Sequence, residues 1–458
     1  YGDHRDLHRV DRRQRQMCIR DRLTLDSITD GDSAAASLAD GGIKIAQANS
    51  ITSLDLTLDD IGPGSSNTNT NLFIDIAGTG VATANVTSTN TSFIVLENSG
   101  NALNTLNLTG SGTLGIQGTL ANSITTINGL NSSANLTITS GTGDDTITGG
   151  SGNDTFNVDS GTDSITDLGG SGSGGESDIL KVSNGATANA TNIKSFTATG
   201  DTQNLGTATL TAISTGGTID MSSASGSAVY TIIGGAGTDN LKGDDGNDTF
   251  KIVASTEGNS DTIDGDGGSA NTLDVSSGTH VLTDNNKIVN IHNITLTNST
   301  INLTNQAEGF KITGGSGTDN ITGGSGDDII IVSAAGQANS DTINGGGGTN
   351  KIEVSTGTHT LTTDGNISNI SEVIAHASGS TINLSNKTEG FTITGNNAGD
   401  IITGGDGNDI IAGKGGDDTL TGGAGNDLFK VETATDSVLD LTNGDNFQDV
   451  SYTHLRAH

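Results

Sequence analysis

Four nine-residue units follow one another without interruption in residues 395–430. They read GNNAGDIIT, GGDGNDIIA, GKGGDDTLT and GGAGNDLFK, and each fits G-G-x-G-x-D-x-U-x, the first loosely, where U is a large apolar residue. The first six residues of a unit predict a tight turn, because glycine adopts left-handed backbone conformations at little cost. The last three predict a minimal strand whose alternation sends U to one face. Stacked units therefore predict an all-β fold with a thin continuous core, formed here by Ile402, Ile411, Leu420 and Phe429.

The same stacking gathers oxygen atoms at the turns. Each sixth-position carboxylate and a row of carbonyl oxygens come to lie beside the equivalent turn one coil away, which makes an all-oxygen cage of the kind that calcium prefers. The four units closely resemble the calcium-binding nonapeptide of the RTX (repeats-in-toxin, haemolysin-type) family. This resemblance implies a parallel β-roll or β-helix solenoid with two nonapeptides per coil and Ca²⁺ held between turns n and n+2. It implies that Asp400 faces Asp418 and that Asp409 faces Asp427.

Further nonapeptides occur upstream at a long, regular spacing. The second, third and terminal sets begin at Gly234, Gly314 and Gly395, which are eighty and eighty-one residues apart. We divide this part of the chain into three nonapeptide blocks, each followed by a β-ladder of short strand-like segments, and a terminal array. The first block with its ladder spans residues 140–233, the second spans 234–313, the third spans 314–394, and the terminal array spans 395–430. The candidate metal ligands at or near position six are Asp145, Asp154, Asp163, Asp178, Asp239, Asp248, Asp261, Asp319, Asp328, Asp341, Asn350, Asp400, Asp409, Asp418 and Asp427.

The segments before the first block contain no nonapeptides. Residues 23–100 form a β-rich Thr/Asn/Ser region with short alternating runs, which is compatible with a small sandwich or with irregular solenoid coils. We favour the solenoid and expect one helical turn at residues 33–39. Residues 101–139 have strand-like runs about ten residues apart and no Asp in their turns, so we interpret them as a calcium-free β-ladder.

Two linker-like copies separate the later blocks. Residues 278–312 and 357–393 share a Gly-Thr-His start and strand-like Thr-Ile-Asn-Leu and Gly-Phe-x-Ile runs, and we interpret them as metal-free coils that continue the stack. Their equivalent histidines, His280 and His359, are interpreted as exposed strand residues inherited by duplication. Residues 431–449 are expected to be a truncated continuation of the terminal array.

The two ends of the chain differ from the rest. Residues 1–22 hold seven of its eight arginines and its one cysteine, and residues 450–458 hold the eighth arginine. Residues 17–21 can be encoded by ATG TGT ATA AGA GAC, whose reverse complement encodes Val-Ser-Tyr-Thr-His, the sequence of residues 450–454. Both ends resemble translated sequencing adapters, and we exclude them from the fold. The open reading frame is then expected to be a fragment of a longer protein.

Without the two ends, the chain has 11 basic and 49 acidic residues, a net charge of −38. Low hydrophobicity with large like charge is typical of disorder. Because many acidic residues recur at the sixth position, a divalent ion would neutralise them, and we expect a chain that is disordered without calcium and folded with it. Such a strongly acidic chain is not expected to bind nucleic acid. It has no run of about eighteen apolar residues that could span a membrane.

The sequence also lacks common catalytic signatures. We find no H-E-x-x-H, no G-x-S-x-G with a plausible triad and no P-loop, so we expect no enzyme activity. Two function classes remain. The first is a structural or adhesive cell-surface protein, similar to calcium-dependent surface-layer proteins or large RTX adhesins, exported by a type I system and binding itself or cell-surface polysaccharide. The alternative is the calcium-folding part of a secreted protease, lipase or toxin whose catalytic domain lies elsewhere.

Overall fold

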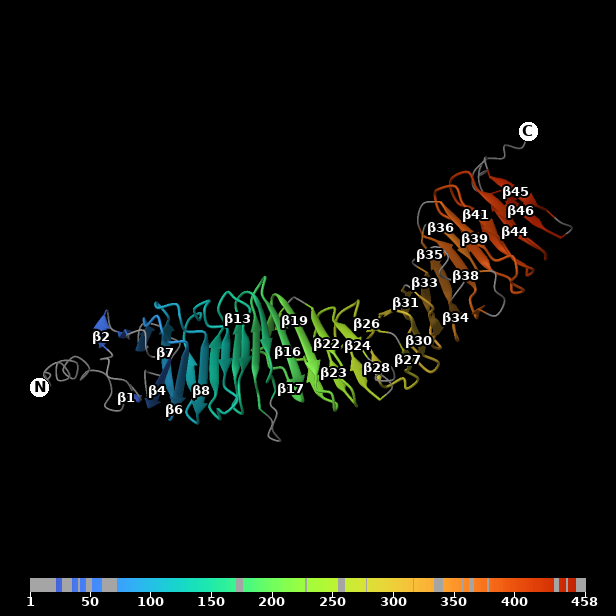
Figure 1. The fold of residues 1–458 in the computed structure, drawn as a ribbon. Coiled ribbons are helices and arrows are strands. Elements are labelled where there is room, and N and C mark those ends of the chain that lie inside the picture. Colours follow the sequence, from blue (N-terminus) through green and yellow to red (C-terminus); the bar gives the residue numbers. More distant parts are fainter. Residues whose placement is uncertain are drawn as a thin grey trace, which may run out of the picture. The chain divides into compact units, whose positions relative to one another are not determined.

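A computed structural model gives the fold of this protein (Figure 1). It divides into two compact units, residues 1–213 with 217–230 and residues 214–216 with 231–458. The excluded ends lie outside the described residues, except Arg22, which begins the first strand. The structure describes residues 22–26, 35–39, 42–46, 52–59, 72–169, 176–226, 229–253, 260–276, 278–315, 317–332, 341–355, 357–361, 366–376, 379–431, 436–441 and 444–449.

The first unit is a solenoid of parallel strands in which a strand pairs with the equivalent strand one coil later. One sheet contains β4 (Ser53–Asp59), β6 (Thr83–Ser88), β8 (Thr105–Gly110), β10 (Thr126–Asn128), β12 (Thr146–Thr148), β14 (Thr162–Ile165), β16 (Thr187–Ile193) and β19 (Thr207–Ala212). A second contains β3 (Gly42–Ala46), β5 (Leu72–Ile76), β7 (Ser92–Glu97), β9 (Leu114–Ile116), β11 (Leu136–Thr139), β13 (Thr155–Val158), β15 (Ile179–Val182), β18 (Gln203–Asn204) and β21 (Ser225–Gly226). Strands β17 (Ser195–Thr197) and β20 (Thr218–Asp220) form a further parallel pair.

The second unit repeats this arrangement with shorter strands. Its longest sheet contains β22 (Tyr230–Ile233), β24 (Thr249–Ile252), β26 (Thr272–Val275), β29 (Asn293–Leu296), β31 (Lys311–Gly314), β33 (Ile329–Val332), β35 (Lys351–Val354), β38 (Glu372–Ala375), β40 (Thr392–Thr394), β42 (Ile410–Ala412), β44 (Leu428–Val431) and β46 (Asn446–Asp449). Smaller sheets contain β23 (Asn240–Lys242), β25 (Thr262–Asp264) and β28 (Ile288–Val289); β27 (Gly278–Val281), β30 (Ser299–Asn302), β32 (Asn320–Thr322), β34 (Thr342–Asn344) and β37 (Ile367–Ser368); and β36 (Gly357–Thr360), β39 (Ser380–Asn383), β41 (Ile401–Thr403), β43 (Thr419–Thr421) and β45 (Ser437–Asp440).

The fold is therefore the predicted all-β parallel solenoid. In the terminal array, Ile402 lies beside Leu420 and Ile411 lies beside Phe429, eighteen residues later, which confirms two nonapeptides per coil. All four side chains are fully buried. The alternation that sends U inward thus also places each U on the equivalent residue of the next coil.

Two local predictions were wrong. Residues 35–39, expected in a helical turn, form β2 (Ala35–Ala39), which pairs antiparallel with β3, just as β1 (Arg22–Asp26) pairs antiparallel with β4. The pairing gives the backbone groups of that segment partners in a neighbouring strand, which a single helical turn lacks. His280 and His359 are fully buried rather than exposed.

The burial of the two histidines follows from strand register. His280 lies beside Ile301 and His359 beside Ile382, so each imidazole belongs to the column of inward-facing side chains. The Nε2 atom of His359 lies 2.9 Å from the carbonyl oxygen of Ser355. Burial lowers the pKa of His280, while its backbone contact with Ser276 acts in the opposite direction. We conclude that both histidines are buried parts of the core.

The packing of the core predicts the effect of truncating one buried side chain. Phe156 is fully buried between Ile138 and Leu180 of the neighbouring coils. Phe156→Ala should lower the free energy of unfolding of the calcium-loaded chain by about 3–5 kcal/mol, because it leaves a cavity. Leu130→Ala is the control, since Leu130 is 63% exposed. Urea unfolding checks both, and equal losses in the two variants would contradict this core assignment.

Candidate metal centre

The turns of the terminal array are shaped by glycine. Gly423 and Gly425, the second and fourth residues of the last nonapeptide, have φ angles of 97° and 119°, which favour glycine. The first glycine of each unit has a different role. A Cβ atom at Gly413 would lie 2.2 Å from Oδ2 of Asp418, and one at Gly422 would lie 2.2 Å from Oδ2 of Asp427. The absent side chain therefore leaves the space into which the sixth-position carboxylate of the same turn folds.

One hydrogen bond repeats between successive coils. The backbone N–H of Asp400 donates to Oδ1 of Asp418 (2.8 Å), and that of Asp409 donates to Oδ1 of Asp427 (2.8 Å). The structure thus brings together the residues that the RTX resemblance pairs. Because one carboxylate oxygen binds the coil before it, the other is directed into the turn, and the sixth-position residues form two rows along the solenoid.

The other blocks repeat this hydrogen bond at every predicted position and also at Asn271, which was not among the predicted ligands. The donor and acceptor residues are Asp145 and Asp163 (3.0 Å), Asp154 and Asp178 (2.8 Å), Asp239 and Asp261 (2.9 Å), Asp248 and Asn271 (2.8 Å), Asp319 and Asp341 (2.9 Å), and Asp328 and Asn350 (2.9 Å). All fifteen predicted residues therefore lie in rows of one geometry, although their role as metal ligands stays a prediction.

Sequence reasoning missed two members of the terminal rows. Asp436 Oδ1 accepts a hydrogen bond from the N–H of Asp418 (3.2 Å), and Asp445 Oδ1 accepts one from the N–H of Asp427 (2.9 Å). The turns that carry them do not keep the glycine pattern. The signal that could have found them is the coil period, because each lies eighteen residues after a predicted ligand.

Within the first block, Asp167 was also missed. Its Oδ2 atom accepts a hydrogen bond from the N–H of Gly150 (2.8 Å), and its side chain is buried. Asp154 and Asp178 lie close enough to Asp167 for like-charge repulsion to act on both of them. Asp167 therefore adds a third carboxylate to the surroundings of this pair.

The rows carry buried negative charge that is only partly compensated. Oδ2 of Asp154, Asp319, Asp418 and Asp427 is buried and accepts no hydrogen bond. Burial raises the pKa of Asp154 to about 7, and repulsion from Asp178 adds to this effect. Burial likewise raises the pKa of Asp418 to about 6, with added repulsion from Asp436 and Asp400. A bound cation would reverse these shifts, because it favours the charged form.

The donor atoms fit calcium. A Cβ atom at Gly404 would lie 2.3 Å from Oδ2 of Asp409 and 2.4 Å from the carbonyl oxygen of Gly422 in the next coil. Carboxylate and carbonyl oxygens therefore converge beside this glycine. Among the described residues, no three His, Cys, Asp or Glu side chains are grouped to hold a metal. A cage at these turns thus depends on backbone carbonyls, which suits Ca²⁺ with its six to eight oxygen ligands better than Zn²⁺.

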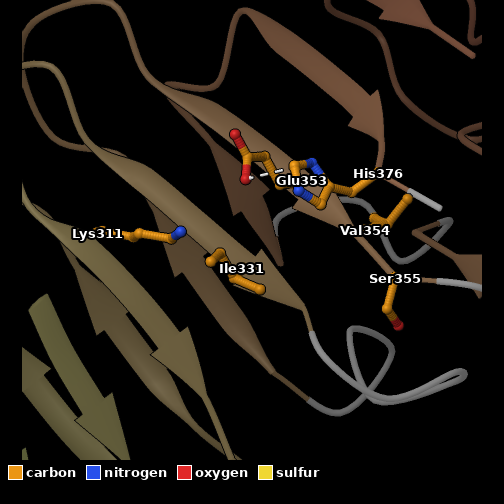
Figure 2. A pocket seen from close by; sticks show the side chains of 6 residues that line it. All are labelled: Lys311, Ile331, Glu353, Val354, Ser355 and His376. Carbon is orange, nitrogen blue, oxygen red and sulfur yellow. Dashed lines mark ion pairs between the residues drawn. The ribbon is translucent and has the colours of Figure 1, made fainter. Parts of the chain in front are cut away.

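A cavity of about 170 Å³ lies elsewhere, on the outer face of the second unit's long sheet (Figure 2). Glu353 lies 3.4 Å from Nζ of Lys351 and 3.9 Å from Nδ1 of His376. Ser355 also lines the cavity, but Figure 2 shows its side chain pointing away from His376. A Ser-His-Glu arrangement for nucleophilic catalysis requires the serine to point toward the histidine.

The rows predict the effect of a ligand substitution. Asp418 is buried, whereas Asp417 is exposed one position earlier in the same turn. Asp418→Ala should weaken calcium binding by the terminal array about tenfold or more, because it removes a carboxylate from a cage with few others. Asp417→Ala should change it little. Calcium titration of the whole chain compares them, and equal losses would mean that the acidic residues act as a diffuse cloud.

The raised pKa values predict a dependence on pH. Asp418 has a pKa of about 6 in the calcium-free fold, above its usual 3.8. The penalty for burying its charge is therefore fully present above pH 6 and disappears as the pH falls below that value. Because a proton on this carboxyl stabilises the folded chain and the unfolded carboxyl stays ionised, the calcium concentration at half-folding should be lower at pH 5 than at pH 7. Circular dichroism measures this midpoint, and a constant midpoint would contradict the prediction.

The blocks were compared with known proteins. The family model of the RTX calcium-binding nonapeptide repeat (4 copies) matches the chain at residues 137–165, 231–250, 313–352, 333–358 and 394–429. Asp178, Asp261, Asp436 and Asp445 lie outside these matches but share the geometry of the rows. No curated protein matches the chain. This chain therefore contains RTX, haemolysin-type calcium-binding nonapeptide repeats carried on a parallel β-solenoid.

Proposed function

We propose that the chain is a calcium-folded structural or adhesive segment of a protein exported to the cell surface or the medium by a type I system. The observation that carries this proposal is the alternation of calcium-type turns with metal-free coils in the same kind of solenoid stack. A compact array would be enough to fold a neighbouring catalytic domain. Repeated blocks separated by spacer coils instead build length, which is what a surface scaffold needs.

The outer face of the first unit supports a role in binding polysaccharide. Asn85, Asn107 and Asn128 form a ladder in which each amide donates to the residue one coil earlier, beginning at Asp55, at distances of 2.6, 2.8 and 3.3 Å. Hydroxyl groups lie beside the ladder, as in the 2.9 Å contact of Thr87 with Thr109. Regular amide and hydroxyl groups at the strand spacing can hydrogen-bond the hydroxyls of a neutral sugar chain.

Two further observations bear on partners. No helix among the residues that the structure describes is long and apolar enough to cross a membrane. The net charge of the whole chain is −34, which opposes binding to nucleic acid.

A binding experiment tests the adhesive role. The calcium-loaded chain should bind purified neutral cell-surface polysaccharide, and Asn107→Lys should weaken that binding about tenfold, because it breaks the ladder where it meets the sugar. Thr137→Lys is the matched control, since Thr137 lies on β11 of the other sheet. Surface plasmon resonance compares the three proteins. Binding that is absent, or lost equally in both variants, would contradict this proposal.

An activity assay separates scaffold from enzyme. The calcium-loaded chain should not turn over protease, esterase or glycosidase substrates. Turnover that disappears in Ser355→Ala or His376→Ala would place catalysis in the cavity of Figure 2 and would refute the structural role. Turnover by the longer protein but not by this chain would favour the alternative, in which the repeats fold a separate catalytic domain.

A further inference from the structure

Two of the sixth-position residues are asparagines, not aspartates. Asn271 ends one row of the second block and Asn350 ends one row of the third, and both side chains are buried. Their Oδ1 atoms accept the same hydrogen bond from the preceding coil that aspartates accept elsewhere. The two residues therefore differ from their aspartate neighbours only at the second atom of the side-chain head, which is an NH₂ group instead of an oxygen.

That NH₂ group lies in the position of the aspartate oxygen. A Cβ at Gly265 would lie 2.2 Å from Nδ2 of Asn271, and one at Gly345 would lie 2.6 Å from Nδ2 of Asn350. These values match those between the first glycine and Oδ2 of the aspartate in the calcium-type turns, such as 2.2 Å at Gly413.

Each amide donates to carbonyl oxygens of two successive coils. Asn350 Nδ2 donates to the carbonyl oxygens of Gly347 in its own turn (2.7 Å) and of Asn369 in the next coil (3.0 Å). Asn271 Nδ2 does the same with Gly267 (2.7 Å) and Asn290 (2.9 Å). Turn carbonyls of this kind are the oxygens that a calcium cage would use, and here they already have N–H donors.

We propose that Asn271 and Asn350 take the place of a calcium ion, so that each closes its row of turns without metal and joins a calcium block to the metal-free coil that follows. The Asn350 side chain, predicted above to be a ligand, is instead a donor that satisfies the carbonyls which a cation would otherwise coordinate. Each substitution also removes one negative charge from its row. The coil that follows can then stack with no ion at that turn.

A buried donor recurs inside the metal-free coils. Gln306 is fully buried, and its Nε2 donates to the carbonyl oxygens of Leu282 (2.7 Å) and Asp284 (3.0 Å). Lys387, at the equivalent place in the next linker copy, is also fully buried. Side-chain N–H groups thus occupy the turns of the spacer coils, where acidic residues at position six are missing.

This inference rests on calcium binding by the repeats and not on the adhesive role, so the two can fail separately. The test uses the whole chain and counts bound calcium by equilibrium dialysis at saturation. Asn350→Asp replaces the donor by a carboxylate oxygen and should add one calcium ion per chain, and Asn271→Asp should add another. Asn305→Asp, which makes the same charge change on an exposed residue of a metal-free coil, should leave the count unchanged. A folded Asn350→Asp variant with an unchanged count would overturn the proposal.

The reverse substitution covers the case in which Asn350→Asp does not fold. Asp427→Asn should lose one calcium ion but keep the coil closed, because its amide can donate to the carbonyls of its turn. Asp427→Ala should lose the same ion without supplying a donor. Calcium-saturated unfolding should therefore show Asp427→Asn to be the more stable of the two. Equal stability of these variants would show that an amide does not substitute for the ion.

Discussion

The structure depends on carboxylates that are buried between successive coils. A sixth-position aspartate such as Asp418 uses one oxygen to bind the backbone of the coil before it, through the N–H of Asp400. The second oxygen is left among turn carbonyls, where burial opposes its charge. Burying a charge costs free energy unless a partner of opposite sign is present. The same contacts that set the spacing of the coils therefore favour a bound cation, and for this reason we expect folding to be coupled to calcium.

Strands of the terminal array bury fewer apolar side chains than the long strands near the start of the first unit. Strand β43 of the terminal array has three residues and buries one of them, Leu420, whereas β4 has seven residues and buries Leu54, Leu56 and Leu58. Because hydrophobic stabilisation grows with the apolar area removed from water, the calcium-free coils near β4 gain more from their core than the terminal array does. Long strands and acidic turns are thus two ways of holding one coil on the next, and the chain uses each in a different region.

Much of this could be predicted from sequence, because one period governs both the core and the turns. The alternation within residues 395–430 predicted the buried U residues, and the resemblance to RTX repeats implied the pairing of Asp400 with Asp418. Asp436 and Asp445 were missed because their turns lack the glycines, although their eighteen-residue spacing continues the rows. The burial of His280 depends on the register with which β27, beginning at Gly278, pairs with β30, and composition does not reveal this register. The role of Asn350 depends on which atom of its amide meets a carbonyl, which only coordinates show.

The ends of the rows show how like charge is limited along the solenoid. In the third block, one row runs from Ser299 through Asp319 to Asp341, and the other runs from Phe310 through Asp328 to Asn350. Each therefore begins at an uncharged residue, and the second also ends at one. In a stack whose stability comes mainly from neighbouring coils, an unbroken column of buried carboxylates would add repulsion at every step. Interrupting the column with neutral residues confines the repulsion to short blocks, each of which a few calcium ions can neutralise, while the parallel strands continue without a break in register.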